Sequence, residues 1–501
     1  MQIHNLKIKD YKILVDFEIN FQKSISLFIG MNGSGKSTLL EAITWIFRSA
    51  NLNFVEGQKD ATPFDFEITY TIRLEDVIEE TSTSSEFETN YIAIKLVGDG
   101  SKKDFWSFET DNSKYSTAEL IKKYGYEKLL PSNLLIYYSG WFETMQVLCH
   151  DHEEIFKKKL REGKSDIDVS ISSAELYTRI KTLPLLYIQK YHFEILLASL
   201  FAFEYNDRVD KFFHDVIKIS KPEVITLSID VKKRQWKQGK GSEDFWGASG
   251  QLLQFLQVLK SYSSNPLNNE ESGILSLVFD LRNWYSIREF YGEEKKIFYL
   301  LHMLHASDML KAIQVFLEKP DFSISHRHLS DGEQQLITIE AINELLIENN
   351  TILLFDEPDT YLHPEWQSGF FDTIILGCID NDFNVKYPES YSHLIVTTHS
   401  PMLISNLRDG DVFNMVDGKA FHYSGSTFGK DSNTILSQTM ESISRTKKVS
   451  IEIETLENLI KEGKFEEAKI KIKDLSEVLG EAEPTLIRLS SIIKRKEIIG
   501  R

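Results

Sequence analysis

The feature that most constrains this sequence is a glycine-rich stretch between an apolar run and a helical pattern. Residues 24–29 have strand character, residues 30–37 read GMNGSGKS, and residues 39–47 have apolar residues at helical spacing. The glycines let main-chain N–H groups turn toward an anion, and the new helix adds its positive dipole end. In this strand–loop–helix context the spacing Gly-x-x-x-x-Gly-Lys-Ser predicts a phosphate-binding loop rather than an accidental glycine-rich turn.

The loop predicts a set of ligand-binding residues for ATP and Mg²⁺. Lys36 can reach the β- and γ-phosphates, and the Ser37 hydroxyl can ligate Mg²⁺. The expected nucleotide-binding residues of this segment are Gly30, Asn32, Gly33, Ser34, Gly35, Lys36, Ser37 and Thr38.

Composition and charge restrict the remaining possibilities. A chain of 501 residues is long enough for two or three domains, and its net charge of −18 argues against indiscriminate wrapping of nucleic acid. Two cysteines cannot form a disulfide framework, and the N-terminal residues lack the apolar core of a signal peptide. The most apolar stretch, near 193–203, is too short to span a bilayer. We therefore expect a soluble, cytoplasmic protein with no membrane contact.

Apolar periodicity predicts β-strands at the beginning of the chain and helices in its middle. Expected strands follow from alternation in 1–29, 64–73, 91–97 and 103–108, with a short buried strand at 134–138. Residues 141–320 are expected to be mostly helical, with helices at 153–161, 173–181, 192–204, 207–219, 250–260, 295–304 and 307–316. Fixed-period repeats and sustained heptads are not visible.

A second chemical block lies more than 290 residues after the phosphate loop. Residues 328–335, HLSDGEQQ, precede an expected helix over 336–348. The apolar run 351–355 ends in Asp356 and Glu357, and the apolar run 394–398 ends in His399. Ligands of α/β sheets bind at such strand ends.

The side chains of this block have the chemistry that ATP hydrolysis needs. Asp356 can hold Mg²⁺ or its waters opposite Ser37, and Glu357 can accept a proton from the attacking water. His399 can contact the γ-phosphate. Each residue alone is most often structural, but together and in this order they predict a catalytic site.

These motifs resemble those of ABC-type ATPases. Residues 329–335 are similar to the signature of that family, 355–359 to its Walker B segment and D-loop, and His399 to its switch histidine. In that family two heads enclose two ATP molecules. The resemblance therefore implies a dimer in which Ser330 and Gly332 act on the nucleotide held by the other copy, and it assigns Asp359 to the D-loop. A conventional Q-loop glutamine is not evident. Gln146 is one candidate, and the assignment of that role stays open.

Lys36 and Asp356 lie 320 residues apart, far more than in a transporter cassette, and the strands and compact helices expected between them differ from the coiled-coil arms of Rad50. Residues 356–367 and 397–401 resemble the OLD group, within the OLD-, RecF- and Rad50-like branch of these ATPases. Residues 427–436 and expected helices near 450–462, 464–479 and 484–499 resemble the end of the PtuA-type ATPases of Septu anti-phage systems and related retrons. Those ATPases work with an HNH-type nuclease, so the resemblance implies such a partner. The ATPase of the PARIS defence system and a repair ATPase of the RecF or Rad50 type are alternatives, as is an ATP-bound scaffold with little turnover.

The resulting fold class is α/β, an ABC-type head with a mixed sheet, a phosphate-loop core and an antiparallel β-lobe. The expected domains are an N-terminal ATPase lobe (1–140), a mostly helical insertion (141–325), a C-terminal ATPase lobe (326–425) and a helical region (426–501).

Three other segments allow two interpretations each. The basic stretch 232–240 could bind a nucleic-acid backbone or be a solvated hairpin. Residues 149–153, CHDHE, have metal-ligating residue types, but no second cluster has the spacing of a zinc site, which favours a structural role. The apolar stripe of the last helices predicts a small core or a docking surface. HNH and TOPRIM patterns are not visible, so we expect that the chain does not cut nucleic acid by itself.

Overall fold

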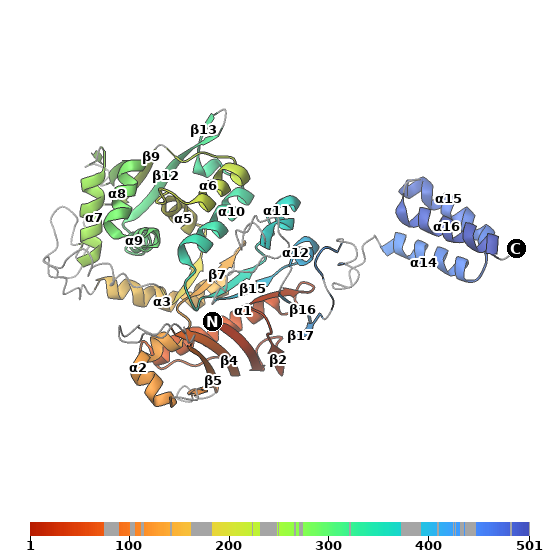
Figure 1. The fold of residues 1–501 in the computed structure, drawn as a ribbon, viewed down its shortest axis with the longest axis horizontal. Coiled ribbons are helices and arrows are strands. Elements are labelled where there is room, and N and C mark those ends of the chain that lie inside the picture. The colour runs from red at the N-terminus through yellow and green to blue at the C-terminus, as the bar shows by residue number, and fades with distance from the viewer. Residues whose placement is uncertain are drawn as a thin grey trace, which may run out of the picture. The chain divides into compact units, whose positions relative to one another are not determined.

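The chain forms two compact units, residues 1–430 and 431–501 (Figure 1). The computed structural model describes residues 1–74, 90–100, 106–111, 115–140, 143–161, 183–222, 224–230, 248, 250–264, 267–269, 274–319, 322–371, 392–407, 410–423, 425, 427–430, 435, 447–480 and 483–499. Among these residues, no helix combines the length and the apolar character needed to cross a membrane.

A seven-stranded sheet carries the phosphate loop, in the order β17-β16-β3-β15-β14-β7-β8. Its neighbouring strands pair in parallel except for β17. The three central strands β3, β14 and β15 are buried along their whole length, because helices or other chain cover both faces of a parallel sheet. The strands are β3 (Ile25–Ile29), β7 (Leu134–Tyr138), β8 (Leu185–Ile188), β14 (Ile352–Asp356), β15 (His393–Thr397), β16 (Asp411–Val416) and β17 (Lys419–His422).

A five-stranded antiparallel sheet with the order β2-β1-β4-β5-β6 forms the N-terminal lobe. Its strands are β1 (Gln2–Lys9), β2 (Phe17–Asn20), β4 (Asp65–Leu74), β5 (Asn90–Gly98) and β6 (Trp106–Asp111). In β4 every second residue is buried, as period-two alternation predicts for a sheet with one covered face. Helix α1 (Lys36–Phe54) shares one apolar core with residues of this sheet and of the central sheet, and α2 (Thr117–Leu129) follows β6. The predicted fold class, a mixed sheet with a phosphate-loop core and an antiparallel β-lobe, is confirmed.

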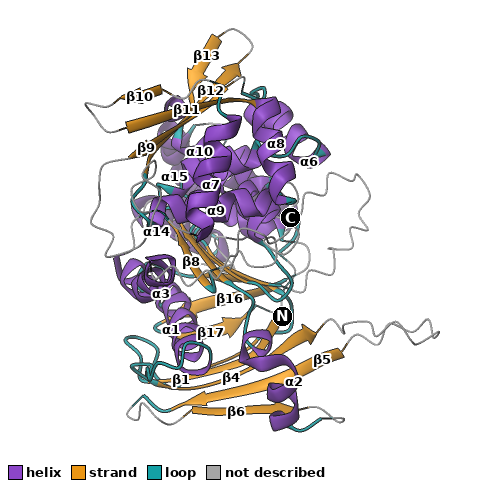
Figure 2. Cartoon of the chain, turned by 90° about the vertical axis from the view of Figure 1, so that its left-hand side faces the viewer, coloured by secondary structure: helices purple, strands orange, loops and turns teal. Residues whose placement is uncertain are grey.

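The middle of the chain contains helices and a second antiparallel sheet. The helices are α3 (Glu143–Arg161), α5 (His192–Leu200), α6 (Asp207–Lys211) with the π-helical turn Phe212–Ile217, α7 (Gly250–Tyr262), α8 (Leu281–Tyr291) and α9 (Glu294–Ala306). The sheet has the order β10-β11-β9-β12-β13 and comprises β9 (Val224–Asp230), β10 (Leu267–Asn269), β11 (Ile274–Asp280), β12 (Leu310–Lys319) and β13 (Phe322–Ser325). Figure 2 shows α7, α8 and α9 near this sheet and the N-terminal lobe at the other end of the unit.

One helix predicted for this region was wrong. The helix predicted over 307–316 is strand β12, in which Ile313, Val315 and Leu317 are buried and alternate with exposed residues. The same apolar residues also fit a helical spacing, and their pairing partner β9 lies about 85 residues earlier, so local periodicity could not decide between the two. The mostly helical interpretation of 141–325 therefore omitted a sheet, and it also omitted β8. The helix predicted at 173–181 lies outside the described residues.

The segment after β13 positions the signature. A 3₁₀ turn (His326–His328) leads to α10 (Asp331–Ala341), which continues as the π-helical turn Ile342–Leu346. Helix α10 begins five residues earlier than the predicted helix over 336–348, because Ser330 and Glu333 form a capping box at its start. In the described residues that follow, the short helix α11 (Pro364–Ser368) comes after β14, and α12 (Pro401–Asn406) comes after β15.

The second unit contains the three predicted C-terminal helices, α14 (Lys447–Lys461), α15 (Phe465–Leu479) and α16 (Pro484–Ile499). They pack around a small apolar core of Leu456, Ile460, Ala468, Leu475, Leu486, Leu489 and Ile493.

Candidate functional site

The phosphate loop lies between β3 and α1, as its sequence predicts. Gly30 has a φ of 147° and Gly35 a φ of 107°, backbone conformations that L side chains rarely adopt. A Cβ on Gly30 would strike the Met415 carbonyl oxygen, and one on Gly35 would lie 3.0 Å from Ile13 Cγ2. Any other residue at these two positions would therefore strain the main chain of the loop. Asn32 and Gly33 form its exposed tip.

Lys36 and Ser34 give the loop the character of an anion site. Lys36 is buried, and its Nζ donates to the Gly30 carbonyl at 3.0 Å and to the Met31 carbonyl at 3.3 Å. Burial lowers the pKa of Lys36, while the carboxylates of Glu357 and Asp356 oppose that shift. The Ser34 hydroxyl is buried and has no hydrogen-bond partner among the described residues. A buried cation and an unsatisfied hydroxyl on a glycine loop fit a bound phosphate.

Asp356 is the last residue of β14, and its carboxylate is buried. The Thr397 hydroxyl donates to Asp356 Oδ1, and the Ser37 hydroxyl also hydrogen-bonds this carboxylate. Burial raises the pKa of Asp356, and these two hydrogen bonds lower it. The parallel pairing of β14 with β15 brings Thr397 opposite Asp356. A carboxylate beside the hydroxyl of Ser37 is a donor set that fits Mg²⁺.

Glu357, His399 and Lys36 form a contiguous set at the end of the central sheet. His399 Nε2 lies 3.1 Å from Glu357 Oε1 and 2.9 Å from Lys36 Nζ. This nitrogen accepts from Lys36 when it has a free lone pair and donates to Glu357 when it carries a proton. The hydrogen bond from His399 is the largest influence on Glu357 and lowers the pKa of its carboxyl group. Glu357 has a φ of 49°, and its N–H donates to the Thr397 carbonyl at 3.1 Å.

Asp359, the predicted D-loop residue, is buried two residues after Glu357. The Thr398 hydroxyl donates to its Oδ1 at 2.8 Å, and burial raises the pKa of Asp359 to about 6. Thr38 is half-buried in the first turn of α1.

The signature residues lie on a different element from the phosphate loop. Ser330 is exposed and caps α10, and its N–H and Oγ donate to Glu333 Oε2 at 2.8 and 2.9 Å. Lys319 Nζ in turn donates to Glu333 Oε1 at 2.9 Å. Gly332 is buried, and a Cβ there would lie 2.8 Å from the Tyr361 carbonyl oxygen. The structure thus brings together the predicted residues of the phosphate loop, Walker B segment and switch, and presents Ser330 on the surface.

Sequence reasoning missed several polar side chains that support these groups. Thr397 and Thr398 bind the carboxylates of Asp356 and Asp359. Gln335 donates to the Pro358 carbonyl, and Gln367 donates to the Asp359 carbonyl at 3.1 Å. The two adjacent threonines before His399 could have been recognised from the sequence as polar residues near the site, because they come at the end of an apolar run that predicts a buried strand. The glutamines gave no such signal, because their partners are main-chain carbonyls elsewhere in the sequence.

The other candidates from the sequence either have partners of their own or lie outside the described residues. In the CHDHE stretch, Asp151 pairs with Arg48 and His152 Nε2 lies 3.1 Å from Asn51 Oδ1. Within the described ranges, no group of three His, Cys, Asp or Glu side chains is arranged to hold a metal ion. Residues 232–240 lie outside the described residues, and Gln146 is on α3 with its role open.

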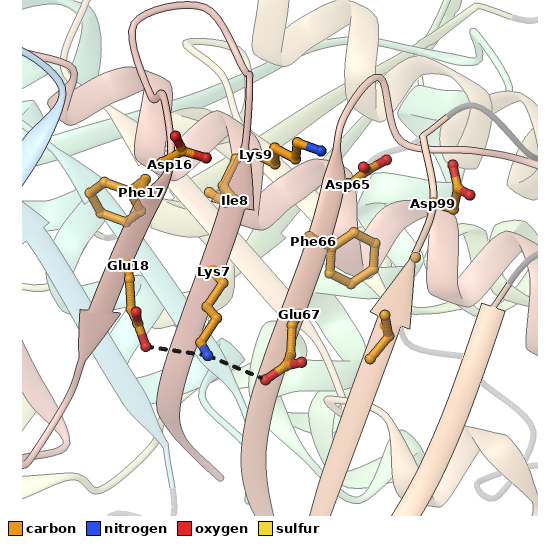
Figure 3. Close-up of a pocket in the computed structure, with 12 residues that line it drawn as sticks. Lys7, Ile8, Lys9, Asp16, Phe17, Glu18, Asp65, Phe66, Glu67 and Asp99 are labelled. Atoms are coloured by element: carbon orange, nitrogen blue, oxygen red, sulfur yellow. Dashed lines mark ion pairs between the residues drawn. The ribbon is translucent and has the colours of Figure 1, made fainter.

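A hollow of about 440 Å³ lies on the N-terminal lobe, and its lining residues do not include those of the phosphate loop (Figure 3). Carboxylates from neighbouring strands line it, and Lys7 Nζ lies between Glu18 at 3.4 Å and Glu67 at 3.8 Å. Cross-strand pairs of opposite charge of this kind are usual on an exposed sheet face.

Comparisons with known proteins found a matching family, sequence relatives and similar solved structures. The chain is 20% identical over 541 residues to the retron Ec83 probable ATPase of Escherichia coli, and this alignment covers 99% of the chain and 87% of the relative. It is 22% identical over 516 residues to the retron Vc95 probable ATPase of Vibrio cholerae, covering 94% and 86%. A solved Smc head bound to the C-terminal winged-helix domain of ScpA has 14% identity and a TM-score of 0.35, over 85% of this chain and 98% of that one. Residues 1–404 match AAA_15, described as an AAA ATPase domain. The chain is therefore an ATPase that belongs to the AAA_15 family.

Proposed function

We propose that the chain binds ATP in the phosphate loop and hydrolyses it with Glu357 as general base. The observation that carries this proposal is the contiguous set of Lys36, His399 and Glu357. A γ-phosphate offers Lys36 a stronger acceptor than an imidazole nitrogen, so binding of ATP should separate Lys36 from His399. His399 is then free to contact the phosphate.

Contact of His399 with the phosphate would also prepare Glu357 for catalysis, because it would break the hydrogen bond between the two side chains. While His399 donates to its carboxylate, the lowered pKa of Glu357 makes it a weak proton acceptor. Release of that hydrogen bond restores the ordinary basicity of the carboxylate at the moment when a phosphate is present. Hydrolysis is thereby tied to occupancy of the site.

The metal ion is assigned to Ser37 and Asp356, whose oxygens lie in hydrogen-bond contact with each other. When bound there, Mg²⁺ would neutralise charge on the β- and γ-phosphates. Thr397 holds Asp356 in place from the neighbouring strand.

We further propose that two copies of the chain enclose two ATP molecules. Ser330 is exposed at the N-terminus of α10, and its N–H and Oγ both donate to Glu333 of the same capping box. An exposed helix start with a serine hydroxyl suits the phosphate of a nucleotide held by another copy. This arrangement is the one that the resemblance to ABC-type ATPases implies for Ser330 and Gly332.

The cellular role that we propose is control of an HNH-type nuclease in bacterial anti-phage defence, in a system similar to Septu. Support comes from the two relatives named as probable retron ATPases, because both alignments cover almost the whole chain. The C-terminal helices resemble those of PtuA-type ATPases, and we assign the contact with the nuclease to them.

The test is reconstitution with the gene product encoded beside this chain. The purified chain is incubated with plasmid and single-stranded DNA in Mg²⁺ or Mn²⁺, with and without ATP. We expect no cleavage by the chain alone, and ATP-dependent control of cleavage when the companion nuclease is added. A Lys36→Ala variant should lose that control.

Cleavage by the chain alone that disappears in a His150→Ala/His152→Ala variant would overturn the proposal, because the effector would then be part of the chain. A companion nuclease whose activity is the same with and without this chain would contradict it as well.

A further inference from the structure

Gln335 is a buried polar residue that packing alone does not explain. It lies on α10, and its side chain is 3% exposed. Its Nε2 donates to the Pro358 carbonyl, whereas its Oε1 has no hydrogen-bond partner among the described residues. The orientation of the amide is set by its partner, because a carbonyl oxygen can accept only from the nitrogen. A buried amide with only one of its two polar atoms hydrogen-bonded is unfavourable for stability. The bond from Gln335 to the Pro358 carbonyl is therefore the contribution that a functional role would have to use.

A second contact joins the same two segments. Gly332, three residues before Gln335, lies so close to the Tyr361 carbonyl that an added Cβ would approach it to 2.8 Å. Helix α10 therefore meets the turn over 358–361 at two points of the signature, at Gly332 and one turn later at Gln335.

Hydrogen bonds continue from this turn to the segment that carries His399. The Thr398 hydroxyl donates to Asp359 Oδ1 and accepts from the Ser400 N–H, both at 2.8 Å. Gln367 donates to the Asp359 carbonyl at 3.1 Å and accepts from the Ser400 hydroxyl at 2.7 Å. The residues on both sides of His399 are thus fixed to the turn that Gln335 contacts.

We propose that Gln335 is a positioning residue that makes the signature of a chain move together with that chain's own catalytic groups. In the two-copy arrangement, on which the coupling part of this inference rests, Ser330 serves one nucleotide and Glu357 and His399 serve the other. The link through Gln335 and Asp359 then joins the two nucleotide sites within each chain. ATP at one site favours the reactive geometry at the other, and turnover depends cooperatively on ATP.

The test compares Gln335→Met with wild type in the full-length chain. Methionine keeps the length of the side chain and removes the donor. We expect kcat to fall on the order of 10-fold or more, because misplaced catalytic groups lose rate steeply. The Hill coefficient for ATP should fall toward 1, while binding of a fluorescent ATP analogue stays within about 2-fold, because the phosphate loop is untouched. The midpoint of thermal unfolding should change by less than about 3 °C.

Thr338→Val is the matched control. Thr338 is also buried on α10, but its hydroxyl donates to the Gln334 carbonyl within the helix at 2.8 Å. This variant should keep the wild-type kcat and Hill coefficient. Gln335→Glu should recover turnover relative to Gln335→Met at pH values at which its carboxyl group is protonated, because a protonated carboxyl can donate to Pro358.

Wild-type kcat and cooperativity in Gln335→Met would overturn the inference. Failure of the two-copy proposal looks different: wild type itself would show a Hill coefficient of 1 and no ATP-dependent association. In that case a fall in kcat specific to Gln335→Met would still support positioning of Asp359 and His399 within one chain.

Discussion

Replacement of Glu357 by glutamine separates binding from chemistry at the proposed site. The change keeps the shape of the side chain but removes a proton acceptor that lies 3.1 Å from His399. Loss of a general base typically costs ~10²–10⁴ in rate. That range corresponds to about 3–5 kcal/mol in the barrier.

The same substitution should preserve or tighten ATP binding. Glu357 adds a negative charge close to Lys36, as its effect on the pKa of that lysine shows. Removing this charge lowers the repulsion that a phosphate would meet, and the contacts of Lys36 and Ser37 with the nucleotide remain. The accumulated ATP-bound state should also make the association of two copies easiest to detect.

The assay is steady-state release of phosphate together with a nucleotide titration of the same preparation. Glu365→Gln is the matched control, because Glu365 is an exposed glutamate in the first turn of α11. It should turn over at the wild-type rate. Turnover of Glu357→Gln near that rate would remove Glu357 from the role of base, and a large loss of ATP affinity would show that its main role is in binding.

Three other predictions concern binding, pH and the C-terminal unit. Lys36→Ala should weaken ATP binding itself, because it removes a charge-assisted contact to the phosphates, and unchanged affinity in a titration would contradict this. Burial lowers the pKa of His302 to about 3, below the value of about 6.5 expected in the unfolded chain, so its contribution to stability is complete above pH 6.5 and is lost as the pH falls from there toward 3. His302→Phe should therefore lose about 2 kcal/mol less stability than wild type between pH 7 and 5 in urea unfolding, and equal losses would refute that assignment. Leu456→Ala, in the core of the C-terminal unit, should cost about 2–5 kcal/mol locally and raise hydrogen exchange in 447–499 without lowering ATPase activity; reduced turnover would show that the two units depend on each other.

The phosphate loop and the strand-end residues could be predicted because short-range sequence determines them. Gly30 and Gly35 are needed for the path of the main chain itself, and Asp356 and His399 each follow an apolar run that ends a strand. The resemblance then supplied roles for residues such as Ser330 that local chemistry alone does not assign.

The sheet in the middle of the chain could not be predicted in the same way. The apolar residues of β12 fit both a strand and a helix, and only pairing with the distant strand β9 decides between them. The functions of Gln335 and Thr398 were hidden for a related reason. Their partners, the Pro358 carbonyl and the Asp359 carboxylate, are brought to them by the fold rather than by their neighbours in sequence.

The central claim, that the signature of one copy acts on the nucleotide of another, is tested most directly by mixing two inactive variants. Lys36→Ala removes the phosphate contact and keeps an intact signature, whereas Ser330→Arg blocks the signature and keeps an intact phosphate loop. In a mixed pair, one of the two sites combines the intact halves. We therefore predict that each variant is inactive alone and that their mixture recovers part of the wild-type turnover. A mixture as inactive as its components, despite confirmed exchange of subunits, would contradict the account.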